Sequence, residues 1–281
     1  MDEYLEVNRR MWDERAPVHA ASPGYQLERL LADPLALSEV VAFDLPRLGR
    51  LDGLDVVHLQ CHIGTDTLSL ARLGARSVAG LDFSAPAIAE ARGLAARAGT
   101  EIAYVQADAY DAPEVLGAHR FDLVYTGVGA LCWLSSIGRW AEVVRRLLRP
   151  GGRVFLREGH PVMNAIDERR ADGALALEFA YFEQPDPLRW EDDEAGTYVE
   201  TDAALRENVS YEWNRGLGEI VTALLARGFR LTQLEEHETL PWEAFTGGRM
   251  EKLTDGEHRL LDRPERLPLS YTLEAVLEER G

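Results

Sequence analysis

The chain has 281 residues, of which 46% are hydrophobic and 28% charged, so its length suits one large domain with additional segments. Its formal charge is −18 and Lys252 is its one lysine, which disfavours a nucleic-acid partner because binding a phosphate backbone requires clustered cationic side chains. No run approaches the roughly 20 apolar residues needed to cross a membrane, and the acidic N-terminus Met1–Tyr4 lacks the apolar core of a signal peptide, so we expect a cytoplasmic protein without a membrane partner.

The first 50 residues predict a helical leader. A helical pattern runs from Glu3 to Trp12, and a loop is expected over 16–25 because it holds two prolines. A second helix is expected over 34–43, ending before Pro46.

Strands and helices then alternate, which predicts a parallel sheet with helices on both faces. Five apolar segments are expected as strands, at 55–60, 77–82, 101–106, 121–126 and 153–158. Thr65, Ser84 and Ser136 are expected to cap the helices that follow three of these strands. A further helix over 216–227 precedes strands at 229–236 and 269–277.

The most informative stretch is the turn after the first strand. A strand running into a turn and a helix places backbone N–H groups and the positive end of a helix over a ligand. Asp82 follows Gly64 by 18 positions (82 − 64), close to the spacing of dinucleotide-binding units. Gln60 and His62, however, stand where glycines would be expected, which leaves little room for a pyrophosphate. A nucleoside ligand without phosphates fits this turn better.

Five segments in this order resemble class I S-adenosylmethionine-dependent methyltransferases, and the Gln-Cys-His loop resembles a bacterial subgroup that acts on small molecules. The segments are Leu59–Gly64, Gly80–Ser84, Val105–Ala109, Phe121–Gly127 and Leu147–Val154. The resemblance implies a Rossmann-like α/β fold, doubly wound, with a seven-stranded sheet that is mostly parallel and has an antiparallel last strand. It also implies an enzyme that uses S-adenosyl-L-methionine and releases S-adenosyl-L-homocysteine.

The resemblance assigns a cofactor role to two carboxylates. Asp82 would accept hydrogen bonds from the ribose hydroxyls, and Asp108 from the adenine amino group; an N-cap role and a turn role are the respective structural alternatives. His62 could instead serve packing. The full set of expected cofactor-binding residues is Gln60, Cys61, His62, Gly64, Asp82, Phe83, Asp108, Ala109, Thr126 and Gly127.

Two residues at the end of the fifth strand are candidates for a general base. His160 has an ordinary pKa suited to proton transfer at neutral pH, and Glu158 could act as the base itself or orient His160. Such a histidine also commonly has a structural role, in which case proximity alone would drive the reaction.

An aromatic-rich insertion at 161–213 divides the expected cofactor-binding domain into 51–160 and 214–281. Segments 177–182 and 207–213 are expected to pair as a flap, and the insertion either forms a substrate lid or only a small hydrophobic cluster. Candidate lid and acceptor residues are Trp12, Arg15, His19, Tyr25, Trp133 and Tyr181.

Two other function classes remain open. One is a nucleotide-sugar or NAD-dependent enzyme of similar architecture, and the other is a non-catalytic cofactor-binding scaffold. Cys61 and Cys132 are expected to be reduced, and no metal site is expected. The acceptor, its O, N or C nucleophile and the oligomeric state, a homodimer included, are not specified by the sequence.

Overall fold

The computed structural model describes residues 3–168, 170, 172–191, 197–199, 201–245 and 247–279; Met1 and Asp2 of the N-terminus considered above lie outside them. A seven-stranded sheet has the order β3-β2-β1-β4-β5-β12-β8. Strands β1 to β5 pair in parallel, and β12 is antiparallel to both β5 and β8, as expected. The strands are β1 Asp55–Leu59, β2 Ser77–Asp82, β3 Ala103–Gln106, β4 Phe121–Thr126, β5 Leu148–Gly159, β8 Phe229–His237 and β12 Ser270–Leu277.

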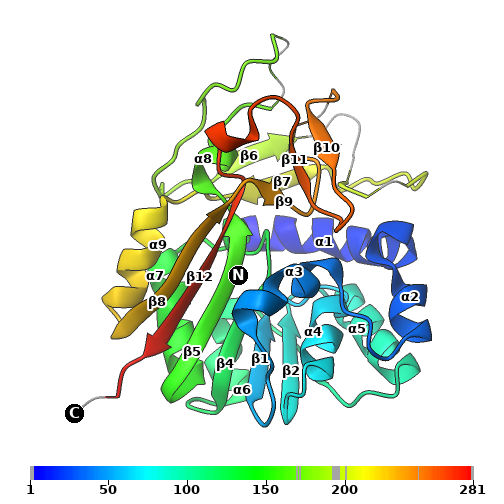
Figure 1. The fold of residues 1–281 in the computed structure, drawn as a ribbon, viewed down its shortest axis with the longest axis vertical. Helices are drawn as coiled ribbons and strands as arrows, with labels where there is room; N and C mark the ends of the chain where they lie inside the picture. The colour runs from blue at the N-terminus through cyan, green and yellow to red at the C-terminus, as the bar shows by residue number, and fades with distance from the viewer. Residues whose placement is uncertain are drawn as a thin grey trace.

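Helices cover both faces of this sheet (Figure 1). On one face lie α6 (Ala112–Leu116), α7 (Ile137–Leu147) and α9 (Leu217–Leu225); on the other lie α3 (Glu39–Leu48), α4 (Thr65–Arg72) and α5 (Ala85–Arg97). Successive side chains of a strand alternate between the two faces, so Val56 and Val57 enter different cores. This double burial explains the apolar run at the middle of the central strands β1, β2 and β4.

Local capping accounts for two of the three expected helix starts. Ser84 and Ser136 accept hydrogen bonds from the backbone N–H three residues ahead, as expected. The expected cap at Thr65 is wrong, because Gly64 holds the N-cap position in a left-handed conformation with φ of 81°. The helix α4 therefore begins at the tight turn itself.

Pro17 and Pro46 do not end helices, contrary to expectation. α1 is one helix over Glu3–Ala21 that continues through Pro17, and α3 continues through Pro46 to Leu48. Packing outweighs the hydrogen bond that each proline removes: Ala16 and His19, on either side of Pro17, are fully buried. A short helix α2 (Leu27–Ala32) follows. α1 lies across the carboxyl end of the sheet (Figure 1).

The insertion forms a strand pair, but not the expected one. After the short helix α8 (Pro161–Asn164), β6 (Leu188–Glu191) pairs antiparallel with β7 (Val209–Glu212). Within 177–182, Leu177 forms one isolated bridge with Ile166, so the prediction of a strand there is wrong. Apolar and aromatic content alone did not distinguish a strand from a packed loop.

A second small sheet lies between β8 and β12 and was not predicted. It comprises β9 (Thr239–Leu240), β10 (Met250–Lys252) and β11 (His258–Leu260). A buried ion pair of 2.6 Å joins Arg157 of β5 to Glu257 beside this sheet. Among the described residues, no helix is both long and apolar enough to cross a bilayer.

Candidate active site

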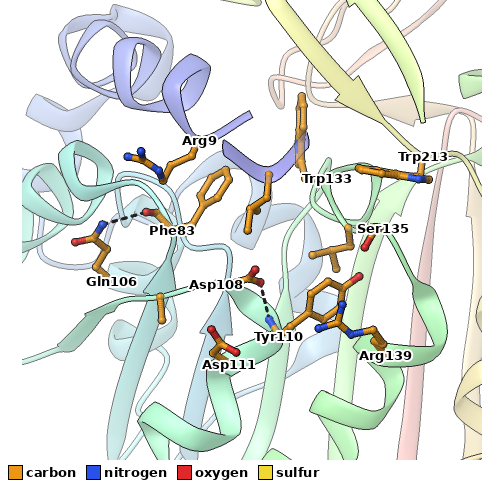
Figure 2. Close-up of a pocket in the computed structure, with 13 residues that line it drawn as sticks. Arg9, Phe83, Gln106, Asp108, Tyr110, Asp111, Trp133, Ser135, Arg139 and Trp213 are labelled. Atoms are coloured by element: carbon orange, nitrogen blue, oxygen red, sulfur yellow. Dashed lines mark hydrogen bonds between the residues drawn. The ribbon is translucent and has the colours of Figure 1, made fainter. Parts of the chain in front are cut away.

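A cavity of about 670 Å³ opens at the carboxyl ends of β2 and β3, beneath α1 (Figure 2). This volume lies within the usual range for small-molecule sites. Its walls come from the sheet, the leader and the end of the insertion. The lining residues are Leu5, Arg9, Phe83, Gln106, Ala107, Asp108, Tyr110, Asp111, Trp133, Leu134, Ser135, Arg139 and Trp213.

The floor of the cavity is held rigidly by Tyr110. Its hydroxyl donates to the carbonyl of Ser136 at 3.1 Å and accepts from the N–H of Ser136 at 2.7 Å. The Arg139 guanidinium lies 3.9 Å from the centre of the Tyr110 ring, and Asp108 accepts from the Tyr110 N–H at 2.8 Å. The pocket therefore combines an aromatic face, on which a flat heterocyclic ring can stack, with a carboxylate that can accept a hydrogen bond from it.

Asp82 lies at the tip of β2 with its carboxylate buried. Oδ2 accepts from the N–H of His62 and Oδ1 from the N–H of Ser84, each at 2.9 Å. Burial raises the pKa of the Asp82 carboxyl to about 6, against the lowering effect of these bonds, so the group is ionised at neutral pH. Each oxygen keeps a further lone pair that can accept a hydroxyl.

A second group of polar atoms lies at the ends of β1 and β4. The Gln60 amide donates to the carbonyl of Ala130 at 2.8 Å, while Gln60 Oε1 and Thr126 Oγ1 are buried without a hydrogen-bond partner among the described residues. A Cβ added at Gly127 would lie 3.5 Å from His58 Nε2, an ordinary van der Waals contact, so neighbouring side chains already line this side of the Gly127 backbone. Buried polar atoms without partners normally receive a ligand or water.

The leader packs aromatic rings onto the turn after β1. Trp12 packs edge-on against His62, with ring centres 5.1 Å apart, and edge-on against Trp133 at 5.3 Å. His19 Nδ1 lies 2.9 Å from His62 Nε2, and the hydroxyl of Tyr25 contacts that of Tyr198 in the insertion. The leader candidates Trp12, His19 and Tyr25 are thus brought together over the turn after β1.

The leader also binds the insertion directly. Asn8 exchanges two hydrogen bonds with the backbone of Tyr211 in β7, at 2.7 and 2.8 Å. Arg15 donates to the carbonyl of Glu207 at 2.8 Å, so its guanidinium joins the leader to the insertion instead of entering the cavity. The Tyr4 ring packs against Trp213, which lines the cavity.

The two candidate bases do not line the main cavity. His160 Nδ1 accepts from the N–H of Val162 at 3.2 Å, and Nε2 lies 2.9 Å from the Glu236 carboxylate; burial lowers the pKa of His160. Glu158 accepts from four backbone N–H groups, those of Gly129, Ala130, Leu131 and Gly159. It lines a small inner cavity whose lining residues also include Trp213 and Tyr271.

Four other candidates contribute backbone or packing. Cys61 and Ala109 are buried in hydrophobic clusters, and burial raises the pKa of the Cys61 thiol. Gly64 has no room for a side chain, since a Cβ there would lie 2.5 Å from the Tyr104 hydroxyl. Tyr181 packs on Gly216 and accepts from the N–H of Leu217 at the start of α9, away from the cavity.

Several cavity residues were not singled out from the sequence. Leu5 and Arg9 are one helical turn apart, a spacing that could have placed them on one face of the leader. Tyr110 follows Asp108 by two positions and could have been included with it. Trp213 is the last residue of the aromatic-rich insertion, and no sequence signal places Arg139 in the cavity.

Comparisons with known proteins identify the architecture. Residues 56–152 match the family model of a methyltransferase domain. This segment is a methyltransferase domain. No curated protein matches it.

Solved methyltransferase structures share this fold across most of the chain. A protein from Listeria monocytogenes, provisionally assigned as an S-adenosylmethionine-dependent methyltransferase, is 19% identical with a TM-score of 0.61, over 86% of this chain and 97% of that one. A methyltransferase of the same type from Mesorhizobium loti is 24% identical with a TM-score of 0.54, over 83% and 97%. One from Methanosarcina mazei is 16% identical with a TM-score of 0.53, over 82% and 94%.

The methyltransferase's own residues fit its cofactor. Phe83 and Asp108 line the cavity where the adenine would lie, and the Asp82 carboxylate lies at the adjoining strand tip for the ribose. The unpartnered oxygens of Gln60 and Thr126 suit the amino-acid portion, whose ammonium group is a donor. When bound, S-adenosylmethionine would supply a methyl group on a sulfonium: an acceptor nucleophile would bond to the methyl carbon in line while the carbon–sulfur bond breaks and S-adenosylhomocysteine leaves.

Proposed function

We propose that this methyltransferase transfers the methyl group to a small-molecule acceptor that enters the 670 Å³ cavity. One observation carries the proposal: the cavity is walled at once by cofactor-side residues (Phe83 and Asp108), by the leader (Arg9) and by the end of the insertion (Trp213). A site closed from three directions suits an acceptor of limited size better than a polymer.

Charge supports the same choice. The formal charge of −18 opposes approach of a nucleic acid, and Arg9, one of the two arginines in the cavity wall, is already paired with Glu6 and Asp13. With Phe83 and Tyr110 on the adenine side of the cavity, the aromatic lining that remains for the acceptor, Trp133 and Trp213, favours a flat or apolar acceptor body.

Positioning and exclusion of water would provide most of the catalysis. Trp12 and Trp133 cover the turn after β1, and the Asn8–Tyr211 contact holds the leader against the insertion. Glu158 keeps the proposed role of base only if the acceptor reaches the inner cavity beside Trp213, a cavity that His160 does not line. We therefore favour proximity over a dedicated base.

The remaining features are part of the same proposal. A cytoplasmic location is consistent with the free thiols of Cys61 and Cys132. The leader contacts of Asn8 and Arg15 are made within one chain, so the site does not require a homodimer.

The test is turnover with labelled S-adenosylmethionine against separate panels of small phenols, amines and carboxylic acids, of tRNA and duplex DNA, and of protein. The proposal predicts methyl transfer to a small molecule. It also predicts that tRNA and duplex DNA do not bind at either low or high salt. Methylation confined to a polymer would overturn it. Cofactor binding without transfer to any panel would favour the scaffold alternative.

A further inference from the structure

His62 occupies a backbone conformation that favours glycine. Its φ is 48°, in the left-handed region that residues with a Cβ seldom adopt. Such a conformation persists where surrounding contacts hold it in place. The imidazole of His62 points away from the sheet to the leader, where it meets His19 and the edge of Trp12.

The contact with His19 holds the His62 ring in place. His19 is fully buried in α1, with Nδ1 at 2.9 Å from His62 Nε2 and Nε2 at 2.6 Å from the Thr197 hydroxyl of the insertion. Burial lowers the pKa of His19 to about 4 and that of His62 to about 3, so both rings are neutral at pH 7. A neutral imidazole has one donor and one acceptor, which lets one N–H···N bond join the rings while Thr197 serves the other nitrogen of His19.

The backbone of His62 continues the connection to the cofactor side. Its N–H donates to Asp82 Oδ2 at 2.9 Å. Thr197, His19, His62 and Asp82 therefore form one hydrogen-bonded series that joins the insertion, the leader, the turn after β1 and the tip of β2. A shift of the His62 backbone would remove a donor from the carboxylate that the ribose hydroxyls need.

We propose that His19 is a positioning residue for the cofactor: by holding the His62 ring it fixes the left-handed turn and, through the His62 N–H, orients the Asp82 carboxylate. This inference rests on the proposed function in that Asp82 is taken to bind the cofactor. It gives a role to a histidine that stands where a glycine would be expected in such a turn. Docking of the leader then contributes to cofactor affinity although His19 contacts no ribose atom itself.

The first arm of the test is calorimetric titration with S-adenosylhomocysteine. His19→Ala and His62→Gly should each weaken binding by about three- to tenfold, the worth of one hydrogen bond. The double variant should be no weaker than either single variant, because the two residues act through one contact. His62→Gln should keep most of the affinity, since its amide nitrogen can take the place of Nε2.

A matched control separates this role from loss of stability. His237 is also a buried neutral histidine, with Nε2 at 2.8 Å from the Thr272 hydroxyl, in β8 far from the turn. His237→Ala should lower the unfolding midpoint without changing the affinity. If His62 merely fills space, His62→Gly relieves the strain at φ of 48° and binding stays unchanged or tightens, which would overturn the proposal.

The second arm uses the cofactor-free protein. His19→Ala should increase amide exchange over residues 60–64, and His237→Ala should not. Equal exchange there in wild type and His19→Ala would contradict the positioning role even if the cofactor binds. Absence of binding by the wild type, with exchange still dependent on His19, would instead refute the proposed function and leave the structural coupling intact.

Discussion

Asn8 pairs with the backbone of Tyr211 as a neighbouring strand would. The side-chain amide donates to the carbonyl and its oxygen accepts from the N–H, at 2.7 and 2.8 Å. The leader thereby completes the free edge of β7, whose other edge pairs with β6. This contact joins segments 203 positions apart in the sequence and holds Tyr4 and Trp213 in contact at the cavity wall.

Removing this amide should loosen the leader. Asn8→Ala leaves the partly buried N–H and carbonyl of Tyr211 without the Asn8 amide, which costs about 1–3 kcal/mol of unfolding free energy. Chemical denaturation measures the loss, and amide exchange should show it concentrated in β7 and α1. Gln184→Ala, at an exposed amide that donates to the nearby carbonyls of Phe182 and Glu183, is the control and should change little. Equal effects of the two substitutions would contradict the role given to Asn8.

The pKa of Asp82 predicts a pH dependence of cofactor affinity. Folding raises this pKa from its usual 3.8 to about 6, so protonation of Asp82 favours the folded state; that contribution is full below pH 4 and is lost as pH rises through 6. Ribose hydroxyls need the ionised form, so affinity for S-adenosylhomocysteine should weaken below pH 6, by up to about tenfold per pH unit. Asp82→Asn should bind weakly with a flat profile between pH 5 and 8. The same pH dependence of affinity in the wild type and in Asp82→Asn would refute the assignment of Asp82 to the ribose.

Gly64 should be intolerant of a side chain. A Cβ at this position, with φ of 81°, would lie 2.5 Å from the Tyr104 hydroxyl and 2.8 Å from the Ala91 Cβ. Gly64→Ala should therefore cost about 1–3 kcal/mol in unfolding experiments and also weaken cofactor binding. Gly93, inside α5 with no atom within 4 Å of its added Cβ, is the matched control. Gly93→Ala should stabilise the protein by about 0.5–1 kcal/mol.

Substitution of His160 separates proximity from base catalysis. Because its ring faces the Val162 N–H and the Glu236 carboxylate, we expect His160→Ala to lower the unfolding midpoint while kcat falls less than about tenfold. A fall of about 10²–10⁴-fold in kcat with unchanged stability would restore His160 as the base. The measurement requires the acceptor that the panels identify.

Much of the sheet could be predicted from the sequence because its signals are local. Apolar runs bounded by turns placed β1 to β5, and Ser84 and Ser136 marked helix starts. Pro17 and Pro46 misled the prediction because tertiary packing outweighs the hydrogen bond that a proline removes. The partner of β7 could not be predicted either, because the choice of partner strand depends on tertiary contacts. An alternating apolar pattern along one strand does not specify them.

The candidate site could likewise be predicted only in part from the sequence. Asp82, Phe83 and Asp108 follow strand ends, so topology alone brings them together. The contact of His19 with His62 spans 43 positions and depends on how α1 docks, for which the sequence offers no periodic signal.

Titration of S-adenosylhomocysteine into the wild type and Asp82→Ala tests the account most directly. We expect one equivalent to bind the wild type and the variant to bind about 10–100-fold more weakly while remaining folded, the cost of a charge-assisted hydrogen bond. NAD should not compete in either protein. Absence of binding by the wild type, or equal affinity in a folded Asp82→Ala variant, would contradict the assignment of this site.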